Sequence, residues 1–196
     1  MKKTLIASAA LLLAFILAAL ARANHEFLFY AAALVPVLGV LALLDRRLDF
    51  SGPGLWAFNA WLLLHLLGGM ASVGGVRLYD LVLVRLLGPP YDVLRYDQAV
   101  HVFCYVAIAI LVHEAVSRLV TGRPLAVAVL TVLAASGIGG LNEILEFTAV
   151  IVVGGTGVGG YVNNALDLVA NLLGALAGTG LCMARRQGRR PGPASP

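Results

Sequence analysis

Charged residues are scarce in this sequence. Only 12% of its 196 residues are Asp, Glu, Lys or Arg, whereas 60% are hydrophobic. A soluble domain carries about 25% charged residues, so this composition excludes an ordinary soluble fold. The hydrophobic residues instead form long blocks, each close to the roughly 20 residues that a helix needs to cross a bilayer. We therefore predict an all-α, polytopic membrane helix bundle over residues 1–184, with about six spans.

Signals of several other protein classes are missing as well. The short alternating segments of a membrane β-barrel are absent. The net charge is +4, but no basic patch with interleaved aromatic residues is present, which excludes nucleic-acid binding. No H-E-x-x-H motif, cysteine-based metal motif or serine nucleophile motif occurs. The two cysteines, Cys104 and Cys182, fall near opposite membrane surfaces, too far apart for a disulfide.

The apolar blocks predict spans over residues 4–21, 27–44, 55–73, 98–116, 124–153 and 164–183. The first block also fits a signal peptide, because Ala21-Arg22-Ala23 resembles a cleavage site. Its apolar stretch is longer than the usual 7–15 residues of a signal sequence, which favours a retained helix.

Three shorter segments connect or follow these spans. Residues 76–96 predict a short helix lying in the membrane interface, because Arg77, Asp80 and Arg85 would share one face. Residues 154–160 are glycine-rich and predict a flexible loop. Residues 185–196 are basic and then rich in Pro, Gly and Ser, and we expect a disordered cytoplasmic tail there.

The distribution of Lys and Arg predicts the orientation. With the N-terminus inside, most of the 14 basic residues lie in cytoplasmic segments. Those that would lie outside are Arg22, Arg77, Arg85 and Arg95. The sequence therefore predicts a multi-pass protein of the inner (plasma) membrane with both termini in the cytoplasm.

Ionisable side chains inside spans are costly and are candidates for a functional site. Three predicted spans bring such groups toward the outer leaflet: the fourth and sixth at their starts, the fifth toward its end. The expected cluster comprises Asp97, His101, Glu143, Glu146, Asp167, Asn163, Asn164 and Asn171. We expect the five ionisable groups to form a catalytic or binding core, and the three amides to orient them.

The chemistry of this cluster depends on how its negative charge is offset. Glu143 and Glu146 share a helical face and would repel each other. A shared proton, a bound cation or a cationic partner would relieve the repulsion, and His101 could be that partner, a general base or a metal ligand. If a divalent cation is present, we expect His101, Glu143 and Glu146 to hold it.

Other polar residues in the spans are expected to play structural roles. Polar side chains in membrane helices often form hydrogen bonds between helices. We assign Asn59, His65 and Asn142 to such bonds, and His113 and Glu114 to the inner membrane interface. Several carboxylates in one place cost more than such bonds return, so for the outer cluster we favour function.

Two stretches of the cluster resemble the VanZ-like bacterial membrane proteins. Residues 97–105, D-Q-A-V-H-V-F-C-Y, are similar to that family's D-K-x-x-H-F-x-x-Y stretch. Residues 167–175, D-L-V-A-N-L-L-G-A, resemble its D-L-x-x-N-x-x-G-A stretch. Tyr96-Asp97 and His101, followed later in the chain by the stretch E-I-L-E-F at residues 143–147, also resemble the related YjdF-type inner-membrane proteins. The resemblance extends over residues 96–178.

This resemblance implies a bacterial inner-membrane protein of the cell envelope and adds Tyr105 to the candidate binding residues. The sequence departs from the family pattern at Gln98, where Lys is usual, and at Glu146, where Gln is frequent. The Arg that usually precedes the last Asp is missing, which weakens any anion-binding role based on it.

We therefore expect the cluster to bind or modify a membrane lipid or a lipid-linked envelope component. An enzymatic role would use acid–base or metal-assisted chemistry. An ion-coupled transporter and a non-enzymatic membrane scaffold are the alternatives. Gly174 and Gly178 form a G-x-x-x-G face that predicts close helix contacts within the chain or in a homo-oligomer.

Overall fold

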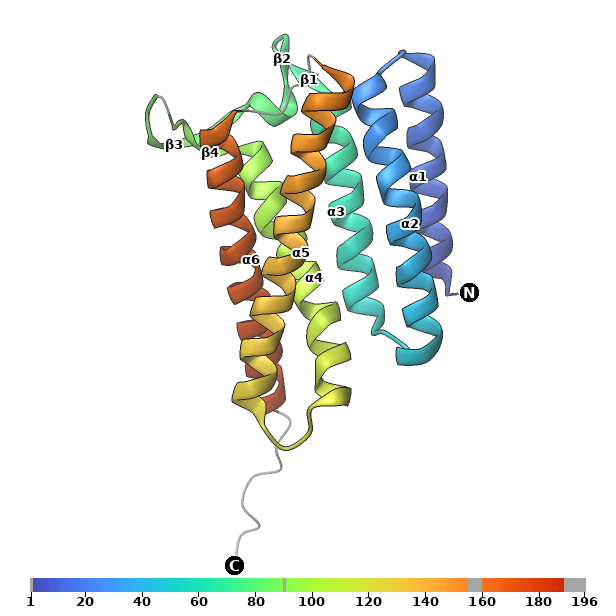
Figure 1. The fold of residues 1–196 in the computed structure, drawn as a ribbon, viewed down its shortest axis with the longest axis vertical. Helices are drawn as coiled ribbons and strands as arrows, with labels where there is room; N and C mark the ends of the chain where they lie inside the picture. The colour runs from blue at the N-terminus through green and yellow to red at the C-terminus, as the bar shows by residue number, and fades with distance from the viewer. Residues whose placement is uncertain (1, 90, 155–159, 189–196) are drawn as a thin grey trace, which may run out of the picture.

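The computed structural model describes residues 2–89, 91–154 and 160–188. Within these residues the chain forms a bundle of six α-helices, in which successive helices run up and down (Figure 1). The helices are α1 (Lys3–Ala21), α2 (His25–Leu48), α3 (Gly52–Met70), α4 (Tyr96–Leu119), α5 (Pro124–Val153) and α6 (Tyr161–Gly188). All of them except α3 are long and apolar enough to cross a membrane. These five confirm a multi-pass bundle, and the span at α3 stays a prediction.

Local sequence signals define where several helices begin. The Asn24 side chain accepts a hydrogen bond from the Phe27 backbone N–H at 3.1 Å and caps α2. Ser51 caps α3 in the same way, with its hydroxyl 3.2 Å from the Gly54 backbone nitrogen. Pro124 opens α5, at a position where its missing N–H leaves no hydrogen bond unmade.

The predicted interfacial helix over residues 76–96 is wrong. Two small antiparallel sheets and a 3₁₀ turn replace it: β1 (Ser72–Val73) with β2 (Val76–Arg77), η1 (Leu78–Asp80), and β3 (Val82–Leu87) with β4 (Val93–Arg95). Gly74 and Gly75 join β1 to β2 with φ values of 59° and 80°, which a two-residue hairpin turn requires. The Val- and Leu-rich run that follows fits a strand as well as a helix.

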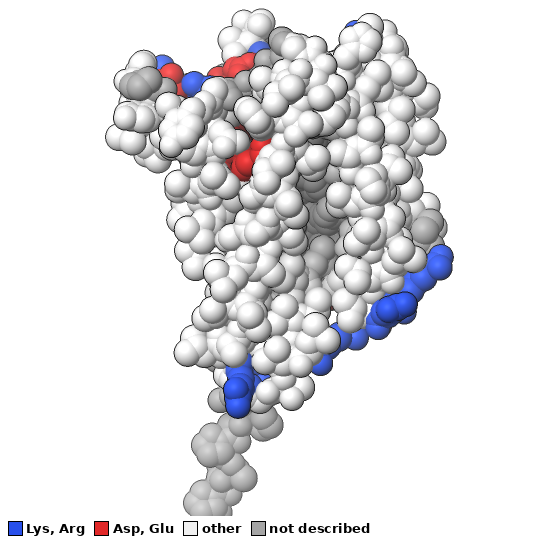
Figure 2. Space-filling view, viewed as in Figure 1, with Lys and Arg blue, Asp and Glu red and all other residues white. Residues whose placement is uncertain are grey.

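The segment 71–95 lies across one end of the bundle, at the top of Figure 1, which we call the covered end. The start of α1 and the end of α6 lie toward the opposite end, which we call the terminal end (Figure 1). On the face drawn in Figure 2, Lys and Arg gather along the terminal end without visible Asp or Glu, whereas the covered end shows Asp and Glu atoms together with a few Lys or Arg atoms. The molecule is therefore polarised along its long axis.

Aromatic packing joins the first three helices beneath the covered end. Phe27 of α2 is 1% exposed and contacts the Phe15 ring edge-on, with ring centroids 5.4 Å apart. Gly69 of α3 leaves room for the Phe27 ring, which a Cβ at that position would overlap. These contacts bring the first turn of α2 against the last turn of α3.

Close packing of α4 against α6 depends on the predicted G-x-x-x-G face. A Cβ on Gly174 would collide with the carbonyl oxygen of Val102, and one on Gly178 would lie 2.7 Å from that of Val106. The prediction of close helix contacts is confirmed, and both glycines make them within the chain. Gly139 of α5 similarly approaches Asn171 of α6, where a Cβ would lie 3.1 Å from the amide nitrogen.

The C-terminal helix is longer than predicted. It continues through Arg185 and Arg186 to Gly188, so the expected tail does not begin at residue 185. Residues 189–196 and most of the expected glycine-rich loop, 155–159, lie outside the described residues.

We predict that Gly174→Ala lowers the free energy of unfolding by about 1–3 kcal/mol, because the added methyl group pushes α6 away from α4. Gly180→Ala is the matched control on the same helix, since nothing lies within 4 Å of its Cβ position. It should be neutral or stabilising by up to about 1 kcal/mol. Thermal unfolding of both variants in detergent measures the difference, and equal melting temperatures would contradict the packing account.

Candidate functional site

The polar residues expected to converge do meet at the covered end. Asp97 and His101 come from the first turns of α4, and Glu143 and Glu146 from the second half of α5. The first three turns of α6 contribute Asp167 and three amides, Asn163, Asn164 and Asn171. Hydrogen bonds between these helices join the group. Tyr105 lies deeper, 2% exposed.

A chain of hydrogen bonds runs across three helices through Asn171. Its amide nitrogen donates to Glu143 Oε1 of α5 at 2.9 Å, and its carbonyl oxygen lies 2.9 Å from His101 Nδ1 of α4. Asn164 donates to the other oxygen of Glu143, also at 2.9 Å. Because the Asn171 nitrogen faces Glu143, which accepts its proton, the Asn171 carbonyl oxygen faces His101. His101 Nδ1 therefore carries a proton and donates it.

The remaining carboxylates are each held by one amide donor. Asn163 donates to Asp167 Oδ2 at 2.5 Å and to Asp97 Oδ2 at 3.3 Å. Asn142, which we had assigned to a bond between helices, instead donates to Glu146 Oε1 on its own helix, at 2.8 Å. The amides thus fix the carboxylates while leaving some of their oxygens without a donor.

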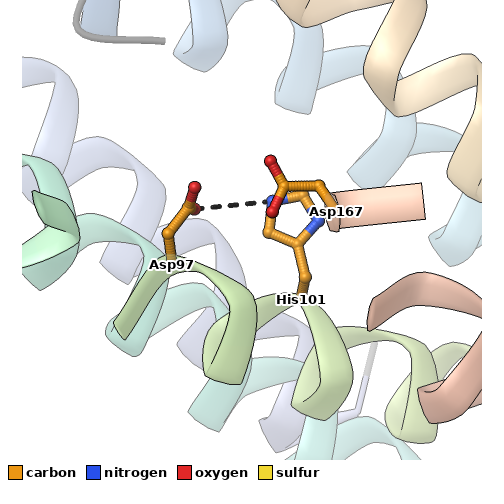
Figure 3. Close-up of side chains that lie close together, drawn as sticks. All are labelled: Asp97, His101 and Asp167. Carbon is orange, nitrogen blue, oxygen red and sulfur yellow. Dashed lines mark ion pairs between the residues drawn. The ribbon is translucent and has the colours of Figure 1, made fainter. Parts of the chain in front are cut away.

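The His101 imidazole is surrounded by carboxylates. Its Nε2 lies 3.6 Å from Asp97 Oδ1 and 3.7 Å from Glu146 Oε1. These distances are longer than hydrogen bonds, so the groups face one another without direct contact. The Asp167 side chain is 0% exposed and stands beside the same ring (Figure 3). Four carboxyl groups, those of Asp97, Glu143, Glu146 and Asp167, therefore surround one imidazole. If they are all ionised, the cluster carries an excess of negative charge.

A polar cavity of about 90 Å³ opens beside this cluster. Asp97, His101, Glu146 and Asn163 line it, as expected for site residues. It has further polar lining residues that the sequence did not point to: Glu26, Tyr30, Arg77, Tyr79, Asp80 and Arg95. Most of these come from the segment 71–95. Because this segment was predicted to be an interfacial helix, the sequence did not indicate that its side chains lie near the cluster.

His65 and Tyr79 line the cavity together with His101. The Tyr79 hydroxyl lies 2.5 Å from His65 Nδ1 and donates to the His65 carbonyl oxygen at 2.9 Å. Burial, together with the charges of Asp97 and Glu146, holds the pKa of Tyr79 well above its usual value. Tyr79 therefore stays protonated as a donor. We expected His65 to form a hydrogen bond between helices. It is instead hydrogen-bonded to Tyr79 of the segment 71–95, and it lines the cavity.

Arg77 brings a fixed positive charge to the cavity. Its guanidinium binds Asp80 at 3.0 Å and lies 3.7 Å from Glu26. Burial alone would lower the pKa of Arg77, but the hydrogen bond and charge of Asp80 outweigh it and raise that pKa. The outer part of the cavity thus carries both signs of charge.

An apolar groove of about 420 Å³ runs along α2, α3, α4 and α5 toward the terminal end. Its walls are mostly aliphatic and aromatic, and its far end lies at Leu44 and Phe50. At its near end Tyr30, His65 and Glu146 line both the groove and the polar cavity. The two spaces therefore meet. Tyr105 lines the groove rather than the cavity.

The polar residues assigned to structural roles elsewhere lie away from this site. Glu114 accepts hydrogen bonds from the backbone and hydroxyl of Ser51, at 2.8 and 2.5 Å. Asn59 donates to the Thr4 carbonyl oxygen at 3.0 Å and so links α3 to α1. His113 lies 3.4 Å from the Thr131 hydroxyl. The Asn59 contact confirms the predicted bond between helices, and the interfacial position of His113 and Glu114 stays a prediction.

Comparison with known proteins identifies a family for the chain. A model of the family described as "Predicted membrane protein (DUF2238)" matches residues 3–188. No curated protein and no solved structure matches the chain. The resemblance to VanZ-like and YjdF-type proteins stays a prediction.

We predict that Asn171→Leu lowers the free energy of unfolding by about 1–3 kcal/mol, because it leaves His101 and Glu143 with buried polar atoms unpaired. The cost should fall sharply when Glu143→Leu is already present. A double-mutant cycle measured by unfolding in detergent should give a coupling energy of about 0.5–3 kcal/mol. Additive effects of the two substitutions would show that the hydrogen-bond chain does not form.

Proposed function

The chain belongs to the DUF2238 family of predicted membrane proteins, and we propose that it binds a lipid whose head group enters the polar cavity and whose hydrocarbon chain lies in the apolar groove. The observation that carries this proposal is the junction of the two spaces at Tyr30, His65 and Glu146. A lipid has the same division into a polar and an apolar part. Binding sites combine an apolar lining with a few polar groups that orient the ligand, as these two spaces do together.

Unpaired polar atoms mark the places where the head group would bind. The Tyr30 hydroxyl is buried at the junction and has no hydrogen-bond partner among the described residues. Arg95 lines the cavity, and its Nε likewise lacks a partner in the part of the chain that the structure describes. Both atoms are hydrogen-bond donors, so they favour a head group that presents oxygen acceptors at this position.

The groove explains how such a lipid would reach the site. It lies between helices at the depth of the bilayer core, so its apolar walls are solvated by hydrocarbon rather than by water. A lipid could enter sideways, with its head group remaining at the membrane surface. Membrane lipids and lipid-linked envelope precursors both fit this description, and both would present their head groups to the same carboxylates and His101.

We further propose that the protein lies in the inner membrane with both termini in the cytoplasm and the covered end outside. The excess of Lys and Arg at the terminal end supports this orientation (Figure 2). It places the polar cavity at the outer leaflet, where envelope components are handled. The site would bind its ligand or, with acid–base or metal-assisted chemistry, modify it.

The two alternative functions receive less support. A transporter needs polar groups along its path, whereas the space leading from the cavity toward the terminal end is lined mainly by apolar side chains. A scaffold would use the Gly174 and Gly178 face for a partner, but that face packs against α4 of the same chain. A homo-oligomer stays a prediction.

We predict that Ile138→Trp, which fills the groove, reduces the lipid that copurifies with the protein at least about fivefold, because the indole occupies the space of the hydrocarbon chain. Leu133→Trp is the matched control: it lies on the same helix, is 63% exposed and does not line the groove. Lipid extracted from detergent-purified protein is quantified by mass spectrometry. Equal retention by both variants would refute lipid binding in the groove.

The orientation of the protein in the membrane can be tested separately, in a variant from which Cys104 and Cys182 have been removed. Val76 lies in the segment 71–95 at the covered end and Arg47 lies near the terminal end, and both are exposed. We predict that Val76→Cys reacts with a membrane-impermeant maleimide in intact cells with a permeable outer membrane, because charged reagents do not cross the bilayer. Arg47→Cys should react only after lysis. The reverse pattern would place the cavity at the cytoplasmic surface.

A further inference from the structure

The hydrogen bonds at the cluster leave a particular set of acceptor atoms unused. Amide donors occupy both oxygens of Glu143, one oxygen of Glu146, and Oδ2 of Asp97 and Asp167. His101 donates from Nδ1, so its Nε2 is the ring nitrogen that faces the remaining oxygens, and in the neutral imidazole this nitrogen carries the lone pair. Several electron-rich atoms therefore face one another.

Asp167 provides a separate indication that something positive belongs among them. Its side chain is 0% exposed, and its Oδ1 has no hydrogen-bond partner in the described residues. A buried carboxylate oxygen without a donor is unfavourable unless a cation or a proton lies beside it. Figure 3 shows this carboxyl group next to the His101 ring and across from Asp97.

The spacing of these atoms is wider than that of hydrogen bonds and close to that of ligands around one metal ion. One ligand atom from each of Asp97, His101 and Asp167 lies within 4.8 Å of the others. Asp97 Oδ1 and His101 Nε2 are 3.6 Å apart. Two ligands that each lie about 2.1 Å from an ion are roughly 3.0–3.4 Å apart in octahedral or tetrahedral geometry. A small adjustment of the side chains would bring this pair to that spacing.

We propose that Asp97, His101 and Asp167 bind one divalent transition-metal ion, such as Mn²⁺ or Zn²⁺. Two carboxylates and an imidazole are ligands that these ions accept. Asp97 and His101 also line the polar cavity, so the remaining coordination positions face it. The ion would offset the excess negative charge of the cluster.

The proposed ligand set differs from the one expected from sequence. His101, Glu143 and Glu146 also lie within 4.8 Å of one another. However, both oxygens of Glu143 are already hydrogen-bonded to amides. Glu143 is therefore a positioning residue, which orients His101 through Asn171, in the way that outer carboxylates orient metal-binding imidazoles. Asp97 and Asp167 take the place expected for Glu143 and Glu146.

Manganese binding to the full-length protein in detergent tests the proposal. After treatment with a chelator, the wild type should bind one Mn²⁺ per chain in calorimetry, and pulsed EPR should show coupling to an imidazole nitrogen. His101→Gln should remove that coupling. Asp97→Asn and Asp167→Asn should each weaken binding at least about 30-fold, whereas Glu114→Gln, whose carboxylate is at the other end of the molecule, should bind as the wild type does.

Two results would overturn the proposal. The first is the absence of saturable binding to the wild type, which would mean that a proton on His101 offsets the charge instead. The second is unchanged affinity in the Asp97→Asn variant, which is a conservative change at a partly exposed position and can be checked for folding by circular dichroism. The metal site does not depend on the lipid: Ile138→Trp should lose lipid and keep Mn²⁺, so the two proposals fail separately.

Discussion

The amide of Asn171 is the contact on which the arrangement of the site depends. It joins His101 of α4 to Glu143 of α5 through two hydrogen bonds of 2.9 Å, at a depth where both partners are buried. Glycines make this contact possible, because Gly139 leaves room for the amide and Gly174 lets α4 approach α6 one turn below it. Helix packing and polar chemistry are therefore set by the same few residues.

This hydrogen-bond chain determines which atoms remain for a ligand. By fixing a proton of His101 on Nδ1 it turns Nε2 toward Asp97, which lines the cavity, while Asp167 lies beside the same ring. The segment 71–95 then encloses the group with Tyr79, Arg77 and Arg95. Charges that are unfavourable at membrane depth are retained at one end of the bundle, next to an apolar groove. That combination is what distinguishes a lipid site from a set of interhelical hydrogen bonds.

Sequence reasoning succeeded where long-range order follows from helix length. The depth of Asp97, Glu143 and Asp167 could be read from helix rise, and the glycine face of α6 from its spacing. It failed at residues 76–96, where a Val- and Leu-rich run has no period that separates strand from interfacial helix, although Gly74-Gly75 was a signal for a hairpin. Tyr30 and Tyr79 were missed because only the tertiary fold brings them to His101.

We propose above all that the polar cavity and the apolar groove hold a single ligand, a lipid. Structure determination of the protein in lipid nanodiscs tests it most directly. The account predicts continuous elongated density from the groove beside Ile138 into the cavity at Tyr30 and Glu146, ending in a head group near Arg95. A groove closed by its own side chains, with lipid density only on the outer surface of the bundle, would contradict it.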